Sequence, residues 1–214
     1  IKAQSAGLFI AGANGMGSYN VRDRVLAGGF DTRDHPYPGN VALISQSGAG
    51  MSGIVDCEQR IQFNFAVSSG YELTVAMEDY LDYALDLPET RVVGLFLETS
   101  RYPKKLIQAF KKANQLNIPI VVLKVGRTDL AAELAISHSG ALAGSDQCYS
   151  ALFDQYGVQR VADMDQLATT LIMFAQPKVV SEGGLVCLHD SGGERQLLID
   201  LADSADVPLA QLSD

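Results

Sequence analysis

A histidine stands in a run of small residues, the string Ser-His-Ser-Gly-Ala-Leu-Ala-Gly-Ser-Asp at 137–146. One nitrogen of a neutral imidazole can attack an electrophile while the other donates a hydrogen bond to a carboxylate. Small neighbours such as Ser139 and Gly140 let a phosphoryl group come close. The chemistry of such a group fits phosphoryl transfer through a phosphohistidine at His138. The alternative is a histidine that is hydrogen-bonded to backbone in a packed loop.

A second group of residues could bind the phosphate. An apolar run at 40–45 is followed by Ser47, Gly48, Ala49 and Gly50. Glycines let the backbone approach an anion, and the first amides of a helix have no partner within the helix. This pattern is typical of a phosphate site. The alternative is a tight strand-to-helix turn in which Ser47 caps the helix, and glycine-containing turns of this kind are common in this fold class.

A carboxylate ends another apolar run. Glu98 closes the segment 91–98, which places it at the carboxyl edge of a sheet, where open parallel sheets bind ligands. A solvated carboxylate at a strand end is the competing interpretation.

The elements that would position these groups alternate along the chain. Buried apolar runs separated by amphipathic stretches predict an α/β fold, a doubly wound parallel sheet covered on both faces. One helix is predicted to place Leu73, Met77, Leu81 and Leu85 on one face. The expected strands are 40–45, 62–69, 91–98, 118–126 and 158–162; the expected helices are 48–60, 72–86, one from Pro103, one from Asp146, and 164–175.

Two flanking segments are assigned to other domains. Residues 1–38, with one expected strand at 7–15, are interpreted as the end of a preceding domain and a linker, and 39–180 as the main domain. Residues 181–214 are expected to form a strand at 184–190, a Ser-Gly loop and a helix at 195–206, a weak repeat of 40–60. Because the chain begins with isoleucine, we expect it to start inside a longer parent.

Composition excludes several classes of protein. A net charge of −9 disfavours nucleic acid as a partner, and the absence of a run of eighteen apolar residues argues against a membrane span. A cytoplasmic protein with reduced thiols at Cys57, Cys148 and Cys187 is expected. No metal site is expected, because the three histidines lack ligand-type spacing. A serine hydrolase is disfavoured because G-x-S-x-G is absent.

Four segments together resemble one family. "GNVALISQSGAG", "VVGLFLE", "PIVVLKVGRT" and "SHSGALAGSDQCYSALFDQYGVQRV" resemble the nucleoside-diphosphate-forming acyl-CoA synthetases, relatives of the succinyl-CoA synthetase alpha subunit. The resemblance implies a flavodoxin-like domain in which His138 carries the phosphoryl group and Glu98 orients it. It also implies that the helix start at Ser47 and Gly48 holds phosphate.

The resemblance further implies the reaction. A carboxylic acid is joined to coenzyme A while ATP or GTP is converted to the diphosphate and phosphate. An acyl phosphate forms, phosphate moves to the histidine, and CoA takes the acyl group. The nucleotide, with Mg, would be bound by an ATP-grasp domain or subunit that this chain lacks. The acid used and the oligomeric state, a homo-oligomer included, stay open.

Two segments depart from the family pattern. "GANGMG" at 12–17 resembles the Gly-Pro-Asn-Cys-(Met/Leu)-Gly segment near the thiol end of CoA: Asn14 matches, whereas Ala13 and Gly15 replace proline and cysteine. "SGGER" at 191–195 resembles the start of a second flavodoxin-like domain but differs from the expected Gly-Gly-Pro-Gly. Most of the CoA-binding domain is expected before residue 1.

These departures keep a second hypothesis open, a regulatory or scaffolding relative that binds CoA or phosphate without ligation. The combination of His138 and Glu98 speaks against it, because a scaffold needs neither a nucleophile nor its orienting group. A flavodoxin-like binder of nucleotide or flavin is a third hypothesis, and the sequence shows no flavin feature.

Overall fold

The computed structural model describes residues 2–29, 32–128, 131, 145–177 and 183–210. The chain forms two compact units, Ile1–Gln176 and Pro177–Asp214. The domain boundaries expected near residues 38 and 180 stay predictions.

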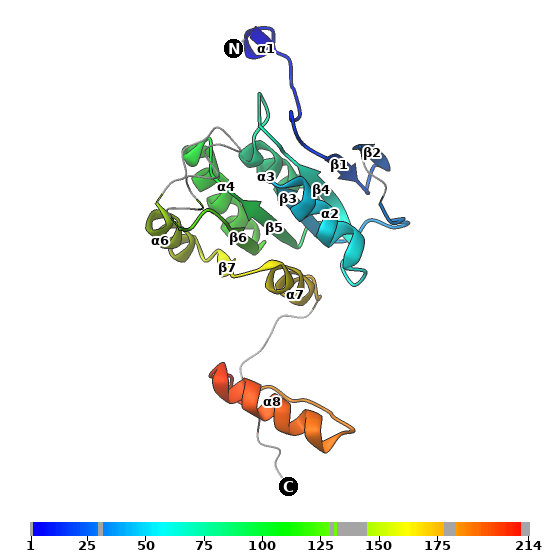
Figure 1. The fold of residues 1–214 in the computed structure, drawn as a ribbon, viewed down its shortest axis with the longest axis vertical. Coiled ribbons are helices and arrows are strands. Elements are labelled where there is room, and N and C mark those ends of the chain that lie inside the picture. The colour runs from blue at the N-terminus through cyan, green and yellow to red at the C-terminus, as the bar shows by residue number, and fades with distance from the viewer. Residues whose placement is uncertain (1, 30–31, 129–130, 132–144, 178–182, 211–214) are drawn as a thin grey trace. The chain divides into compact units, whose positions relative to one another are not determined.

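The first unit is built on a seven-stranded sheet in the order β2-β1-β4-β3-β5-β6-β7 (Figure 1). The strands β4, β3, β5, β6 and β7 are neighbours in this order and run parallel to one another. This order is the one found in flavodoxin-like folds. The strands are β1 Gly17–Asn20, β2 Val25–Gly28, β3 Val41–Ser45, β4 Phe63–Ser68, β5 Val92–Leu97, β6 Ile120–Lys124 and β7 Gln159–Val161.

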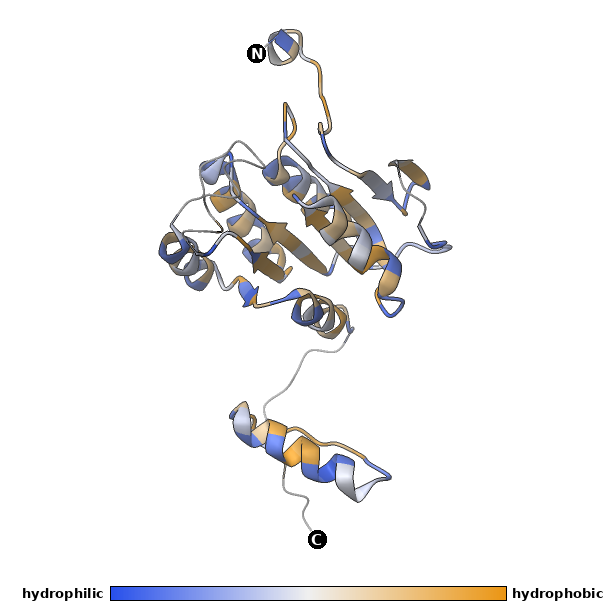
Figure 2. Cartoon of the chain, viewed as in Figure 1, coloured by the Kyte–Doolittle hydropathy of each residue, from blue (hydrophilic) through white to orange (hydrophobic). Residues whose placement is uncertain are grey.

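Helices cover both faces of this sheet. One hydrophobic cluster includes Met51 and Ile54 of α2 and Leu171 of α7; the other includes Leu81 of α3 and Phe110 of α4. Strands β3, β4 and β6 are buried along their whole length, and Figure 2 shows the central strands of the sheet as largely apolar. The doubly wound fold is therefore confirmed. The helices are α1 Lys2–Ser5, α2 Gly48–Cys57, α3 Met77–Asp86, α4 Pro103–Leu116, α6 Asp146–Tyr156 and α7 Met164–Phe174.

The N-terminal segment differs from the expectation. No strand forms at 7–15; instead β1 and β2 make an antiparallel hairpin, and β1 pairs antiparallel with β4. The turn of this hairpin contains Arg24 at φ 56° rather than an Asn-Gly or Gly-Gly pair, so the usual hairpin signal is missing. The sheet is consequently mixed at this edge.

The segment after the hairpin is held by one arginine. Arg33 donates from Nε to Val55 O (2.8 Å) and from Nη2 to Glu58 O (3.1 Å) and Ile61 O (2.8 Å). The last carbonyl groups of a helix have no hydrogen-bond donor within the helix. The Arg33 side chain supplies donors to these groups at the end of α2.

Helix α3 begins later than expected. It starts at Met77, and Leu73, predicted on its buried face, lies before the helix with 52% of its surface exposed. The backbone at 71–73 is used differently: Tyr71 N–H donates to Ala13 O at 2.6 Å, and Leu73 N–H donates to Gly12 O at 3.0 Å. These long-range bonds replace the first helical turn.

The second unit contains α8, Gly192–Ser204. The strand expected at 184–190 does not form: Leu185 makes only an isolated parallel bridge with Leu209. Ser191 caps α8, so the expected Ser-Gly loop is the start of the helix. Among the described residues, no helix combines the length and apolar composition needed to cross a lipid bilayer.

Candidate functional site

The order of the strands selects one edge of the sheet. In open α/β sheets, ligands bind outside the carboxyl ends of the strands where the strand order reverses. Here that point lies between β3 and β5, which are adjacent and parallel, with Ser45 opposite Phe96. Ser47 follows β3 and Glu98 follows β5, so the structure brings these two residues to the same edge. Their chemical roles stay predictions.

Ser47 caps α2. Its Oγ accepts a hydrogen bond from Gly50 N–H at 3.1 Å, and its carbonyl accepts one from Met51 N–H at 3.1 Å. A Cβ atom on Gly50 would lie 3.0 Å from Phe96 Cδ2, so the helix approaches β5 closely at this point. The amides of Gly48 and Ala49 precede the first intrahelical bond. The cap uses the N–H group of Gly50, whereas an anion would use those of Gly48 and Ala49. Capping and anion binding are therefore compatible here.

A glutamine that the sequence reasoning missed joins the two strand ends. Gln46 Oε1 accepts hydrogen bonds from the N–H groups of Glu98 (2.7 Å) and Thr99 (3.0 Å), and Gln46 Nε2 donates to Thr99 O at 2.7 Å. The carboxamide of Gln46 thus forms hydrogen bonds with three backbone groups of the β5–α4 loop. The position of Glu98 relative to the start of α2 is fixed by these bonds.

A buried lysine supports Glu98 from the neighbouring strand. Lys124, at the end of β6, is 1% exposed and donates from Nζ to Glu98 O at 2.7 Å and to Val125 O. Its Nζ also lies 4.8 Å from the ring centroid of Tyr149, a distance suited to a cation–π interaction. Burial lowers the pKa of Lys124. The Glu98 backbone is therefore held from both sides, while its side chain is only partly buried.

Two buried glutamates lie at the same edge and were also missed. Glu72 Oε1 accepts hydrogen bonds from Gln46 Nε2 (2.9 Å), Ser69 Oγ (2.8 Å) and Met77 N–H (3.0 Å). Glu78 Oε1 accepts hydrogen bonds from Ser100 Oγ and from Tyr102 N–H (3.2 Å), both in the β5–α4 loop. Burial raises the pKa of Glu72, and the nearby Glu78 adds to this effect. Only tertiary contacts reveal that these acids are buried.

The segment with Asn14 and Gly15 crosses the end of β4. A Cβ atom on Gly15 would lie 2.5 Å from Ser68 O, and one on Gly70 would lie 2.2 Å from Ala13 O. Asn14, at φ 54°, is exposed. An exposed carboxamide suits contact with the end of a cofactor such as CoA, but two residues cannot enclose one.

Residues 137–144 of the string around His138 lie outside the described residues. This holds for His138, Ser139 and Gly140. The string ends at Asp146, the first residue of α6, which pairs with Arg160 Nη2 and lies 4.0 Å from Arg127 Nε. Hydrogen bonding to Arg160 lowers the pKa of Asp146.

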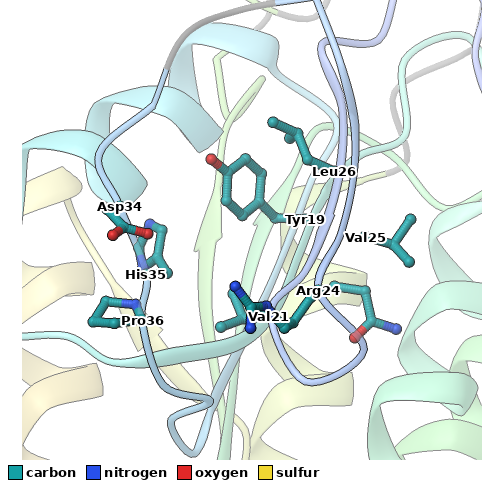
Figure 3. Close-up of a pocket in the computed structure, with 9 residues that line it drawn as sticks. Tyr19, Val21, Arg24, Val25, Leu26, Asp34, His35 and Pro36 are labelled. Carbon is teal, nitrogen blue, oxygen red and sulfur yellow. The ribbon is translucent and has the colours of Figure 1, made fainter.

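The first unit also has features away from this edge. A hollow of about 260 Å³ lies between the β1–β2 hairpin and residues 34–36, lined by Tyr19, Arg24 and His35 among others (Figure 3). It is away from the switch point, because the register pairs Asn20 with Phe65, before the carboxyl end of β4. In the described part of the chain, no three His, Cys, Asp or Glu side chains gather as metal ligands do.

Comparisons with known proteins find relatives of this chain. The chain is 30% identical to the 4-hydroxybutyrate–CoA ligase (ADP-forming) of Nitrosopumilus maritimus over 99% of this chain and 31% of that protein. It is 31% identical to the acetate–CoA ligase (ADP-forming) II subunit alpha of Pyrococcus furiosus, over 99% of this chain and 46% of that subunit. The chain therefore spans less than half the length of these relatives.

A solved structure is similar as well. The dinucleotide forming acetyl-coenzyme A synthetase 1 of Ca. Korarchaeum cryptofilum, in complex with phosphate and ADP, matches with a TM-score of 0.84 and 27% identity, over 99% of this chain and 46% of that chain. The family model described as succinyl-CoA ligase like flavodoxin domain matches residues 38–174, which include β3 to β7 and the candidate edge. The chain belongs to this family.

Proposed function

We propose that this chain is the central part of an NDP-forming acyl-CoA ligase, which converts a carboxylic acid, CoA and ATP or GTP to acyl-CoA, the nucleoside diphosphate and phosphate. One observation supports the proposal most strongly. Gln46, the residue before Ser47, accepts hydrogen bonds from the backbone of Glu98 and Thr99, and so brings Ser47 and Glu98 together at the switch point. The relatives named as ADP-forming acid–CoA ligases support the type of reaction.

Each proposed residue has a chemical task. His138 takes the phosphoryl group: a bond forms between an imidazole nitrogen and phosphorus while the bond from phosphorus to the leaving oxygen breaks. Glu98 accepts a hydrogen bond from the other nitrogen and so orients the ring. The helix start at Ser47, Gly48, Ala49 and Gly50 neutralises part of the phosphate charge, because amides and the helix dipole favour anions there. Ser139 and Gly140 leave room for this approach.

The direction of the reaction decides the order of these steps. Transfer from an acyl phosphate to His138, and from there to the diphosphate, regenerates the nucleoside triphosphate. Synthesis of acyl-CoA uses the same steps in reverse, which corrects the order implied by the resemblance: the phosphohistidine forms first, the carboxylate then accepts the phosphoryl group, and the CoA thiol displaces phosphate from the acyl phosphate. An acyl phosphate that gave its phosphoryl group to the histidine would return to the free acid and leave CoA no activated acyl group. When bound, CoA supplies the thiol that accepts the acyl group, and the nucleotide supplies the phosphoryl group.

The remaining parts of the proposal concern the whole protein. Residues 1–38 end a CoA-binding domain and linker, with Asn14 and Gly15 near the cofactor; 39–180 are the ligase domain, and 181–214 begin a second flavodoxin-like domain. An ATP-grasp domain or subunit, with Mg, would bring the nucleotide to this cytoplasmic protein. The small acid, or its acyl phosphate, is the other substrate.

Labelling tests the central step. We expect the full-length protein that contains this chain to take up ³²P from a labelled acyl phosphate, and the label to be stable in base and lost in acid, as a phosphohistidine is. His138→Asn should abolish the label, whereas the matched control His189→Asn should retain it. Label that survives in His138→Asn would exclude His138 as the carrier.

One observation favours a second candidate, a CoA- or phosphate-binding relative that performs no ligation. Gly15 is packed so tightly on Ser68 that the cysteine of the family pattern would clash in this backbone. Incubation of the full-length protein with candidate acids, CoA and ATP separates the two candidates. Diphosphate formation that depends on both acid and CoA eliminates the non-catalytic candidate.

A further inference from the structure

The segment that carries His138 connects β6 to α6, and residues at both of its ends contact the loop that carries Glu98. Lys124, the last residue of β6, donates from Nζ to Glu98 O at 2.7 Å. Tyr149, in the first turn of α6, accepts at Oη a hydrogen bond from Ser100 N–H at 2.8 Å. The β5–α4 loop is therefore bonded to the chain on both sides of the segment that contains His138.

Lys124 and Tyr149 also contact each other. Lys124 Nζ lies 4.8 Å from the centroid of the Tyr149 ring, within the range of a cation–π interaction. In the described part of the chain, the other acceptors of this ammonium group are carbonyls, those of Glu98 and Val125. Lys124 is 1% exposed and Tyr149 is 9% exposed. Water therefore competes little for these contacts, and removal of one partner leaves a buried polar group unpaired, which is costly.

A second pair of charges joins the same two ends. Arg127, three residues after Lys124, has its Nε 4.0 Å from Oδ2 of Asp146, the first residue of α6. The side chain of Arg127 is 54% exposed, so solvent screens this pair, and it is weaker than the buried contacts of Lys124 and Tyr149. The two ends of the connection are thus held near each other twice, once through the Glu98 loop and once directly.

We propose that Lys124 and Tyr149 are positioning residues that hold both ends of this connection on the Glu98 loop, so that the His138 imidazole can meet the Glu98 carboxylate. The inference rests on the proposed function, in which Glu98 orients His138. A loop whose ends are joined has fewer conformations than one whose ends are free. Joining these ends at the loop that carries Glu98 favours the encounter of the two groups. Misplacement of such a pair lowers the rate even when binding is unchanged.

Single-turnover labelling of the full-length protein tests the inference. The rate of phosphohistidine formation is measured with the ³²P-labelled acyl phosphate that labels the parent. Tyr149→Phe removes the acceptor of Ser100 N–H but keeps the ring beside Lys124, and should lower the maximal rate roughly 3- to 10-fold, the effect of one lost hydrogen bond. Lys124→Met removes both donated bonds at similar volume and should lower that rate roughly 10- to 100-fold. The acyl phosphate concentration that gives half the maximal rate should change by less than about twofold, because neither side chain is proposed to bind substrate.

A double-mutant cycle shows whether the two residues act through Glu98. Adding Tyr149→Phe to Glu98→Gln should slow labelling by less than about twofold, because the group that Tyr149 positions is already lost. The matched control is Tyr156→Phe on the same helix, whose ring lies against Phe110 with the ring centroids 6.2 Å apart. Its rate should stay within about twofold of the parent. An unchanged rate in Tyr149→Phe, the same loss with and without Glu98, or an equal loss in Tyr156→Phe overturns the inference.

Amide hydrogen exchange without substrate separates failure of this inference from failure of the proposed function. In Tyr149→Phe and in Lys124→Met, exchange should become roughly 5- to 10-fold faster both in residues 98–102 and in the first turn of α6, whereas β3 should not change. This result supports the inference even if the parent forms no phosphohistidine. Faster exchange in only one of the two segments, or in neither, overturns it, whether or not the parent is a ligase. If Lys124→Met does not fold, Tyr149→Phe decides both measurements.

Discussion

Two segments of the chain share a local pattern but differ in their surroundings. Residues 41–57 and 185–204 each contain an apolar run, a serine cap and a glycine-started helix. In the first, β3 is fully buried between β4 and β5. In the second, Leu185 makes an isolated bridge, and Leu188 is 95% exposed.

The difference teaches which features are local and which are not. Both helices start with the same cap, since Ser47 Oγ accepts from Gly50 N–H at 3.1 Å and Ser191 Oγ accepts from Glu194 N–H at 3.5 Å. A strand, by contrast, needs neighbours that accept and donate its hydrogen bonds. Among the described residues, only the first segment has such neighbours in its unit, and there the β5–α4 loop is hydrogen-bonded to the segment through Gln46.

Substitution of the apolar runs should give the largest contrast. Ile44→Ala removes a fully buried side chain of β3 and should lower the free energy of unfolding by about 2–5 kcal/mol, because it leaves a cavity. Leu188→Ala, at an exposed position, should change it by less than about 0.5 kcal/mol. Urea denaturation of both variants measures the difference, and equal losses would contradict the comparison.

Removal of the two caps should have smaller effects. Ser47→Ala should cost about 0.5–2 kcal/mol of global unfolding free energy, because Gly50 N–H loses its acceptor in a packed helix. Ser191→Ala should mainly increase amide hydrogen exchange in the first turn of α8. Hydrogen exchange and urea denaturation together check this distinction; a global loss in Ser191→Ala as large as that in Ser47→Ala would refute it.

The smallest effect is expected at the end of α2. Glu58 has its pKa lowered from 4.5 to about 2, chiefly by hydrogen bonds from Arg60. A lowered pKa in the folded state means that this stabilisation is present above about pH 4.5 and is lost as the pH falls toward about 2. NMR titration should show the Glu58 pKa moving toward 4.5 in Arg60→Gln. No change in that variant would remove Arg60 as the cause. The effect on stability should be small, because Arg60 is exposed and Glu58 is only partly buried, so solvent screens the pair.

Much of the fold could be predicted from the sequence because its signals are local. The runs at 40–45 and 91–98 became β3 and β5 within one residue at each end. Pro103 begins α4 as expected, since its fixed φ suits the first helical turn. The β1–β2 hairpin was missed because its turn lacks glycine, and the strand at 184–190 was wrong because an apolar run alone does not supply a pairing partner.

The candidate site was predictable only in outline. Ser47 and Glu98 could be assigned to strand ends, because parallel strands bring their carboxyl ends to one edge. Gln46, Glu72 and Lys124 could not, because each is defined by contacts with loops distant in sequence. A polar side chain next to an apolar run looks the same in sequence whether it faces water or joins two loops. The roles predicted for His138, Ser139 and Gly140 stay predictions.

The close contact between Gly15 and Ser68 also constrains how this protein can have diverged. A cysteine at position 15 requires the 12–16 segment to move away from β4, and that movement would break the bonds from Tyr71 and Leu73 to the carbonyls of Ala13 and Gly12. A change from glycine to the cysteine of the family pattern at position 15 therefore requires more than one substitution. The residue and the path of the backbone must change together, so intermediates that carry only one change should be selected against.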